Sequence, residues 1–335
     1  MNNHTNAWKW VGFLAAAAGL LLCLAASILF GAVNYNWHTA WDAAFHYDEA
    51  VSEQVILRTT RMPRAFIAAA IGASLAIAGA LMQTLTRNPL ASPSVLGVNA
   101  GATCLVVIAA VALSVSSMQA LAWIAFIGAA AGALAVYALG SIGRDGLTPL
   151  KIVLAGSAMT ALFASITQGI LVLNKQGLSS VLFWLTGTIA GRSPDMLVAV
   201  LPYMAVSWLG AWFLSRDMNV LQMGEDTAKG LGQKTIAVKA LAGLIIVVLA
   251  GSSVSIAGPI GFIGIVIPHI SRFFIGIDHR WVIPYCAVLG AIVLILSDLA
   301  ARFMMIPEEM PVGVMTAVIG APFFIYIARR GLVKS

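Results

Sequence analysis

The sequence predicts an all-α membrane protein: a polytopic bundle of about ten transmembrane helices with both termini on the cytoplasmic side. Of the 335 residues, 60% are hydrophobic and only 10% are charged, whereas soluble domains carry about 25% charged residues. A helical span needs about 20 apolar residues to cross a bilayer, so this composition supplies roughly ten spans. It excludes a soluble globular protein and leaves no room for a large attached enzyme domain.

Ten apolar stretches follow one another along the chain. They cover residues 11–33, 65–86, 94–114, 120–140, 152–173, 196–214, 240–257, 259–271, 281–297 and 312–328. The first stretch follows Lys9 and is longer than the apolar core of a signal peptide, about 7–15 residues, so we expect it to be the first span. The stretch at 259–271 is short and holds Pro259 and Pro268, which predicts a broken helix that neighbouring protein has to cover.

The distribution of basic residues sets the predicted orientation. Ten spans place both termini on one side of the membrane, and that side holds 13 of the 19 lysines and arginines. Cytoplasmic loops carry the excess of Lys and Arg, so we expect cytoplasmic termini. The net charge of +6 is explained by this topology and requires no nucleic-acid partner.

The chain carries no recognisable machinery for hydrolysing a nucleotide or for catalysis. A phosphate-binding loop of the form G-x-x-x-x-G-K-[ST] is absent, and its nearest imitation, Gly230-Leu-Gly-Gln-Lys-Thr235, has the wrong spacing. Neither H-E-x-x-H nor G-x-S-x-G occurs, and the three cysteines lie far apart within apolar stretches. We therefore expect no catalytic residue, no metal site and no cofactor, and a protein that is not itself an enzyme.

Charged side chains are also nearly absent from the middle of the apolar stretches. A charge at the bilayer centre costs about 2.5–3.5 kcal/mol, and ion-coupled transporters retain such charges as relays. Asp298 and Arg302 lie instead at the outer end of the ninth stretch, where we expect a local pair one helical turn apart. A transporting bundle of this kind would draw its energy from a separate subunit that hydrolyses ATP. An ion-coupled secondary transporter, a membrane-embedded enzyme and a structural scaffold are the alternatives.

Two connections are long enough to carry a function. In the cytoplasmic segment 216–235, Asp217 is a candidate N-cap of a short helix, and Gly224 or Gly232 is a candidate helix end. This segment is either an amphipathic loop on the membrane or a docking element that passes motion from an ATPase into the spans, and its composition does not choose between them. The extracytoplasmic loop 34–62 is rich in aromatic residues, which is typical of the headgroup region.

Five motifs occur in order along the chain. They are Arg61-Met-Pro-Arg64; Asn88-Pro-Leu-Ala-Ser-Pro-Ser-Val-Leu-Gly97; Gly224-Glu-Asp-Thr-Ala-Lys-Gly-Leu-Gly232; Gly258-Pro-Ile-Gly-Phe-Ile-Gly-Ile-Val-Ile-Pro-His269, with Asp278-His-Arg280 behind it; and Pro311-Val-Gly-Val-Met-Thr316 with Gly320-Ala-Pro-Phe323. With these motifs the chain resembles the permease subunits of type II ABC importers, which carry iron–siderophore complexes, haem and cobalamin. The resemblance covers about residues 55–330.

The resemblance implies a single transmembrane permease domain over residues 1–335 in the cytoplasmic (inner) cell membrane. Its partners would be a second permease subunit, identical or homologous, two ATP-binding cassette ATPase subunits and an extracytoplasmic substrate-binding protein. The expected cargo is a ferric siderophore complex, with haem or cobalamin as the alternative. The residues do not choose among these cargoes, because the binding protein hands over the substrate.

The resemblance also assigns residues at the outer face. Arg61, Arg64 and Arg302 would receive carboxylates of the binding protein. Guanidinium groups suit this role because they stay charged and bind carboxylates through two parallel hydrogen bonds. The competing interpretation is that these long side chains simply extend toward the headgroups at the ends of spans.

At the cytoplasmic face, the resemblance assigns one ATPase-coupling element and one gate. The coupling residues would be Gly224, Glu225, Ala228 and Gly232. The gate that narrows the cytoplasmic exit would be formed by Asn88 and Leu90. Because Asn-Pro also initiates ordinary turns, a plain turn is the alternative for this last pair.

Overall fold

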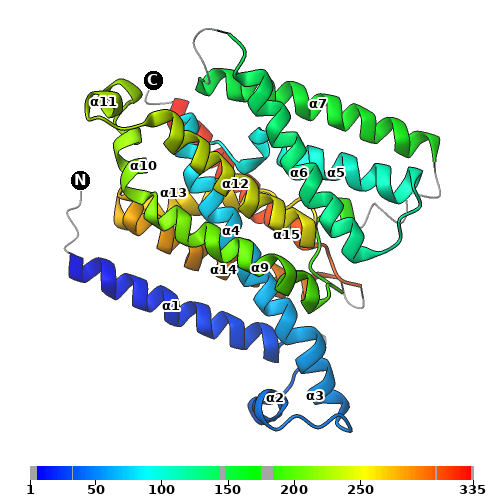
Figure 1. Ribbon diagram of the computed structural model, residues 1–335. Helices are drawn as coiled ribbons and strands as arrows, with labels where there is room; N and C mark the ends of the chain where they lie inside the picture. The colour runs from blue at the N-terminus through cyan, green and yellow to red at the C-terminus, as the bar shows by residue number, and fades with distance from the viewer. Residues whose placement is uncertain (1–5, 32, 144–147, 175–183, 306–307, 333–335) are drawn as a thin grey trace.

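A computed structural model describes residues 6–31, 33–143, 148–174, 184–305 and 308–332, and Figure 1 shows that helices dominate them. No strand occurs in these ranges. The longer helices are α1 (Asn6–Leu29), α4 (Met62–Thr86), α5 (Val98–Val107), α6 (Met118–Gly140), α7 (Pro149–Leu173), α9 (Pro194–Phe213), α12 (Thr235–Ala257), α13 (Ile263–Ile275), α14 (His279–Met304) and α15 (Val312–Leu332). The short helices are α2 (Trp37–Phe45), α3 (Ser52–Ile56), α10 (Ser215–Gln222) and α11 (Glu225–Gly230).

The predicted membrane bundle is confirmed. Seven described helices are long and apolar enough to cross a membrane, and three shorter apolar helices accompany them at Val98–Ala112, Ile263–Ile275 and Val312–Tyr326. Each of the ten apolar stretches of the sequence coincides with one of these helices. Helix α1 begins and α15 ends at the end of the bundle that carries α10 and α11 (Figure 1).

Helix α4 forms the centre of the bundle. In its most apolar 18-residue stretch, 89% of the residues are buried, against 6% for α1 at the periphery. Small residues allow the close approach, because a Cβ on Gly72 would collide with the backbone carbonyl of Gly290 in α14, and a Cβ on Gly79 with that of Gly264 in α13. In lipid, such small-residue contacts let helix backbones pack closely. The other spans therefore pack around α4.

The break expected near Pro259 is present. Helix α12 ends at Ala257, the chain turns at Gly258 with φ +74°, and α13 begins only at Ile263. The freed backbone is covered by protein, as expected for an irregular segment at membrane depth: the amide of Thr188 donates to the carbonyl of Ala257 at 2.7 Å.

Candidate docking and coupling sites

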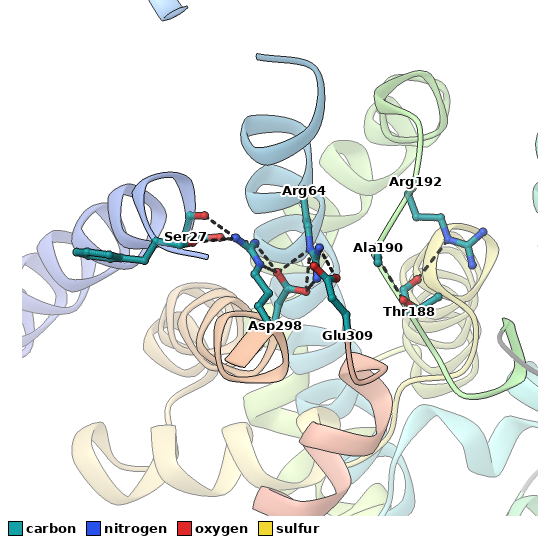
Figure 2. Close-up of polar contacts among 9 residues, drawn as sticks. Ser27, Arg64, Thr188, Ala190, Arg192, Asp298 and Glu309 are labelled. Carbon is teal, nitrogen blue, oxygen red and sulfur yellow. Dashed lines mark hydrogen bonds and ion pairs between the residues drawn. The ribbon is translucent and has the colours of Figure 1, made fainter. Parts of the chain in front are cut away.

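A buried carboxylate joins two arginines at the end of the bundle opposite α10 and α11, the end that the sequence predicts to face outward. Asp298 on α14 is only 1% exposed and accepts hydrogen bonds from Arg64 Nε at 3.0 and 3.1 Å and from Arg64 Nη2 at 2.8 Å. It also accepts from Arg302 Nη2 at 2.6 Å and Nε at 3.1 Å (Figure 2). The local pair expected between Asp298 and Arg302 is therefore confirmed. We call Arg64, Asp298 and Arg302 the outer charge cluster.

The remaining donors of Arg302 fasten the end of α1. Its Nη1 donates to the carbonyl of Ser27 at 2.7 Å, and its Nη2 donates to the Ser27 hydroxyl at 2.9 Å. The last carbonyls of a helix have no partner within the helix, so an arginine from a neighbouring element satisfies them well. Arg302 thus ties α1 to α14 while also neutralising Asp298.

Arg61 also binds backbone carbonyls at and after the end of α1. Its guanidinium donates to the carbonyls of Ile28 at 3.2 Å, Leu29 at 3.1 Å and Val33 at 2.5 Å. It also lies over the ring of Tyr35, 4.5 Å from the ring centre. Arg61 is buried, and in this conformation its guanidinium donates hydrogen bonds to carbonyls of the same chain. Its role in docking the binding protein stays a prediction.

Arg64 is the member of the predicted docking set that reaches toward the surface. Its side chain is 11% exposed, and its Nη1 donates at 2.7 Å to Glu309, which is 37% exposed. Sequence reasoning did not single out Glu309, because the two residues are 245 positions apart and nothing in the local pattern links them. The exposed Arg58 nearby lies over the ring of Tyr47 at 4.3 Å and has no carboxylate partner among the described residues.

The coupling segment folds into two short helices at the opposite end. Gly224 and Gly232 have φ values of +125° and +80°, conformations that glycine adopts far more readily than other residues. Between them, Ala228 is fully buried. Gly224 lies just after the end of α10 and Gly232 just after the end of α11, so the expectation that one of them follows a helix end is confirmed.

Glu225 joins α11 to the membrane span that follows. Its carboxylate lies 2.6 Å from Lys239 Nζ on α12 and 3.2 Å from Lys229 Nζ. The hydrogen bond from Lys239 is the main reason that the pKa of Glu225 falls below its ordinary value. The carboxylate is therefore ionised at neutral pH and acts as a charged strut between α11 and α12.

The expectation that Asp217 caps a helix is wrong. Helix α10 begins at Ser215, and Leu214, the residue before it, still bonds to Gly210 of α9. Because a single residue separates the two helices, α10 has no free first turn where Asp217 would cap. Asp217 instead accepts hydrogen bonds from Gln233 Nε2 at 2.9 Å to its carbonyl and 3.2 Å to its carboxylate.

A polar junction joins α10 to two membrane helices. Asn219 on α10 donates to Asp278 at 2.6 Å, and its amide oxygen accepts from the backbone amide of His279 at 2.8 Å. The same oxygen lies 2.9 Å from His279 Nδ1, so this ring nitrogen carries the proton. The other ring nitrogen, Nε2, lies 2.7 Å from the hydroxyl of Thr84 on α4. His279 is completely buried, and we call these four residues the junction.

The predicted gate residues lie in a tight turn after α4. Arg87 adopts the left-handed conformation with φ +51°, and the Asn88 side chain accepts from the amide of Leu90 at 2.9 Å. The Asn88 carbonyl accepts from Ala91 at 3.1 Å. The turn is therefore confirmed, with Asn88 exposed and Leu90 half-buried, whereas the gating role stays a prediction.

Helix α7 carries an exposed polar stripe that sequence reasoning missed. Ser157, Thr160, Ser165 and Gln168 are all exposed, and their spacing places them on one helix face. A hydroxyl can donate a hydrogen bond to a carbonyl of its own helix, as Ser165 does to Ala161 at 2.8 Å. An exposed Gln amide, by contrast, costs free energy when it faces lipid. This face therefore suits another protein surface or an aqueous path. The polar residues and their spacing are visible in the sequence, but only the structure shows that this face of α7 is left exposed.

A bundle of membrane-spanning helices with a charge cluster at one end and a protruding helix pair at the other has the architecture of a transport permease. The chain matches the model of the FecCD transport family over residues 19–330. It belongs to that family, and the resemblance inferred from the five motifs is confirmed.

Individual relatives agree with the family. The chain is 52% identical over 96% of its length to 97% of the Bacillus subtilis protein named "Probable siderophore transport system permease protein YfiZ". It is 46% identical over 93% of its length to 82% of the iron(3+)-hydroxamate import system permease protein FhuB of the same organism. Among solved structures, a metal-chelate type ABC transporter in an inward-facing conformation superposes with a TM-score of 0.84 at 25% identity, covering 95% of this chain and 98% of that one. The chain is thus a multi-pass membrane permease of the ABC importer type.

Proposed function

We propose that the chain is the transmembrane subunit of an ATP-driven importer that moves ferric siderophore complexes across the cytoplasmic membrane. The observation that carries the proposal is the 52% identity, along nearly the full length of both chains, to a permease named for siderophore transport. The second relative is named for iron(3+)-hydroxamate import, which favours iron chelates over haem or cobalamin.

The whole chain 1–335 would act as one permease domain that pairs with a second permease subunit. Support comes from the polar stripe of α7, because a single chain leaves Ser157, Thr160, Ser165 and Gln168 exposed. A second subunit would cover this face or leave it lining a water-filled path between the two chains. Such a path would be neutral, which suits a bulky chelate delivered by another protein.

The outer charge cluster would receive the substrate-binding protein. Arg64 is its best-placed member, because Glu309, its more exposed partner, can give way to a carboxylate from the incoming protein while Asp298 keeps the guanidinium in place. Arg61 and Arg302 would contribute after rearrangement, since their donors now hold the end of α1. Docking would therefore pull on α1, α4 and α14 together.

The ATPase subunits would bind α11 and the glycines on either side of it. The buried Ala228 and the strut from Glu225 to Lys239 make α11 rigid relative to α12. The junction connects the adjacent α10 to α14 and α4. A displacement of α11 would thus reach α4, whose end leads directly into the gate at Asn88 and Leu90.

The test is reconstitution with the partner subunits in proteoliposomes. A ferric hydroxamate labelled with radioactive iron should accumulate when ATP is supplied on the ATPase side and the binding protein on the other, and an uncoupler should leave uptake unchanged. Haem and cobalamin serve as competing cargoes. Uptake that collapses with the proton gradient, or that proceeds without ATPase subunits, contradicts the proposal, and preferential uptake of haem or cobalamin contradicts the choice of cargo.

The site assignments are tested in the same vesicles. Arg64→Glu should weaken capture of the binding protein, whereas Arg87→Glu, a charge reversal at the cytoplasmic end of the same helix, should not. Glu225→Gln should reduce the stimulation of ATP hydrolysis by loaded binding protein while the complex still assembles. Normal capture by Arg64→Glu would remove the docking assignment without affecting the assignment of cargo.

A further inference from the structure

A hollow at the cytoplasmic end of the bundle gathers two arginines from distant parts of the chain. It has a volume of about 310 Å³ and is lined by Trp212, Phe213, Ser215, Arg216 and Arg280. The first three residues lie where α9 passes into α10, and Arg280 lies in the first turn of α14. Neither the proposed transport function nor the coupling assignment uses this hollow.

The positive charge of the hollow is poorly balanced by the chain itself. Arg216 is exposed and makes no ion pair with a described carboxylate. The carboxylate nearest Arg280 is that of Asp278, whose Oδ1 lies 3.9 Å from Arg280 Nε. That same oxygen already accepts from Asn219 at 2.6 Å and from the backbone amide of Arg280 at 3.0 Å. The Arg280 side chain stays 58% exposed.

A further cation lies close by. Lys9, at the start of α1, is held beside the start of α14 because its carbonyl accepts from the Tyr285 hydroxyl at 2.7 Å. Burial raises the pKa of the Asp278 carboxyl, but the hydrogen bonds from Asn219 and the Arg280 amide, with smaller contributions from the charges of Arg280 and Lys9, lower it below its ordinary value. Asp278 therefore faces two cations, Arg280 and Lys9, at the level where the spans α1 and α14 begin.

The apolar walls of the hollow point to a lipid. The side chains of Trp212 and Phe213 are exposed at the last turn of a membrane span, and Trp in this position is typical of the membrane–water interface. The cytoplasmic leaflet carries anionic lipids that basic residues next to the membrane attract. Guanidinium groups bind phosphate through paired hydrogen bonds.

We propose that this hollow binds the headgroup of an anionic phospholipid of the cytoplasmic leaflet. The phosphate lies between Arg216 and Arg280, and one acyl chain runs along Trp212 and Phe213. The lipid then bridges α10 and α14, the same two helices that the junction connects at His279. It reinforces the contact through which α10 is held to the bundle.

Native mass spectrometry of the delipidated protein tests the proposal, with phosphatidylglycerol and phosphatidylcholine as the two probes. Each basic residue near the surface contributes about 1 kcal/mol to attraction of anionic lipid, so removing two should weaken binding about 30-fold. The double variant Arg216→Gln/Arg280→Gln should therefore lose most of its phosphatidylglycerol. The control Arg87→Gln/Lys234→Gln removes two exposed charges from the same face and should bind as the unchanged protein does.

A second measurement avoids the double variant. Brominated phosphatidylglycerol should quench the tryptophan fluorescence of the unchanged protein more than that of Trp212→Phe, and brominated phosphatidylcholine should show a much smaller difference. Equal loss of lipid in both double variants would overturn the proposal, because it would reduce the effect to overall charge. Equal binding of phosphatidylglycerol and phosphatidylcholine would overturn the proposal as well. So would equal quenching of the unchanged protein and of Trp212→Phe by brominated phosphatidylglycerol.

Discussion

Replacing Asp298 with Asn leaves the buried guanidinium group of Arg302, and that of Arg64, which is 11% exposed, without the negative charge that now lies between them. Asp298 is 1% exposed and Arg302 is 4% exposed, so water cannot take over the lost role. Breaking a buried ion pair by removing one partner costs about 3–5 kcal/mol, because the remaining charge stays buried and uncompensated. Asn keeps the size of the side chain, so this cost reflects charge rather than a cavity.

Glu309 supplies the matched comparison. It contacts the same Arg64 at 2.7 Å but is 37% exposed, and exposed ion pairs contribute at most about 1 kcal/mol. Glu309→Gln should therefore lower the unfolding midpoint of the purified protein, measured thermally in one detergent, far less than Asp298→Asn does. If the two variants unfold at the same midpoint, the outer charge cluster does not have the structural role assigned to it.

The remaining predictions concern the end of the bundle that carries α10 and α11, and the helix packing. The pKa of Glu225 is lowered in the folded protein, so its contacts with the lysines stabilise α11 fully at a pH above the ordinary carboxyl pKa. This stabilisation is lost as the pH falls through the lowered pKa of the folded protein. Proteolysis of this segment should therefore rise in acid, and it should rise less in Glu225→Gln, which already lacks the charged contacts. Gly72→Ala should destabilise the bundle by about 1–3 kcal/mol because α4 and α14 have to separate, whereas Gly169→Ala, whose Cβ would meet nothing within 4 Å, should be tolerated in the same thermal assay. His279→Ala removes the hydrogen bonds of both ring nitrogens with Asn219 and Thr84, each worth about 0.5–1.5 kcal/mol, and should uncouple ATP hydrolysis from transport; normal coupling would exclude the junction as the transmission route.

The spans could be predicted because composition alone determines them. An uncharged stretch of about 20 residues has few stable places other than a bilayer, and a short stretch with two prolines predicted the break before α13. The polar contacts could not be predicted in the same way. Arg64 and Asp298 are 234 positions apart, so the sequence indicated only the partner of Asp298 that lies one turn away, Arg302.

Two further features escaped the sequence for different physical reasons. The exposed stripe on α7 is a property of what does not pack against it, and hydropathy along one chain carries no record of missing neighbours. Asp217 was misassigned because helix capping requires a free first turn, and only the structure shows that α9 runs almost directly into α10. The five motifs identified the family, whereas packing decides which of their side chains are free to meet a partner.

The position of α4 gives the two ends of the molecule a common mechanical element. At the N-terminal end of α4, Arg64 reaches Asp298 on α14, and at its C-terminal end, Thr84 reaches His279 on the same helix. Between these points the two helices touch through Gly72 and Gly290, so they are held at three levels and should move as one body. A displacement of α10 should therefore be transmitted along α4 and α14 to Arg64, because neither helix has a flexible segment between these contacts that would absorb it. Substitutions at Thr84 should consequently alter capture of the binding protein at the far end, whereas substitutions at equally buried positions of α5 should not.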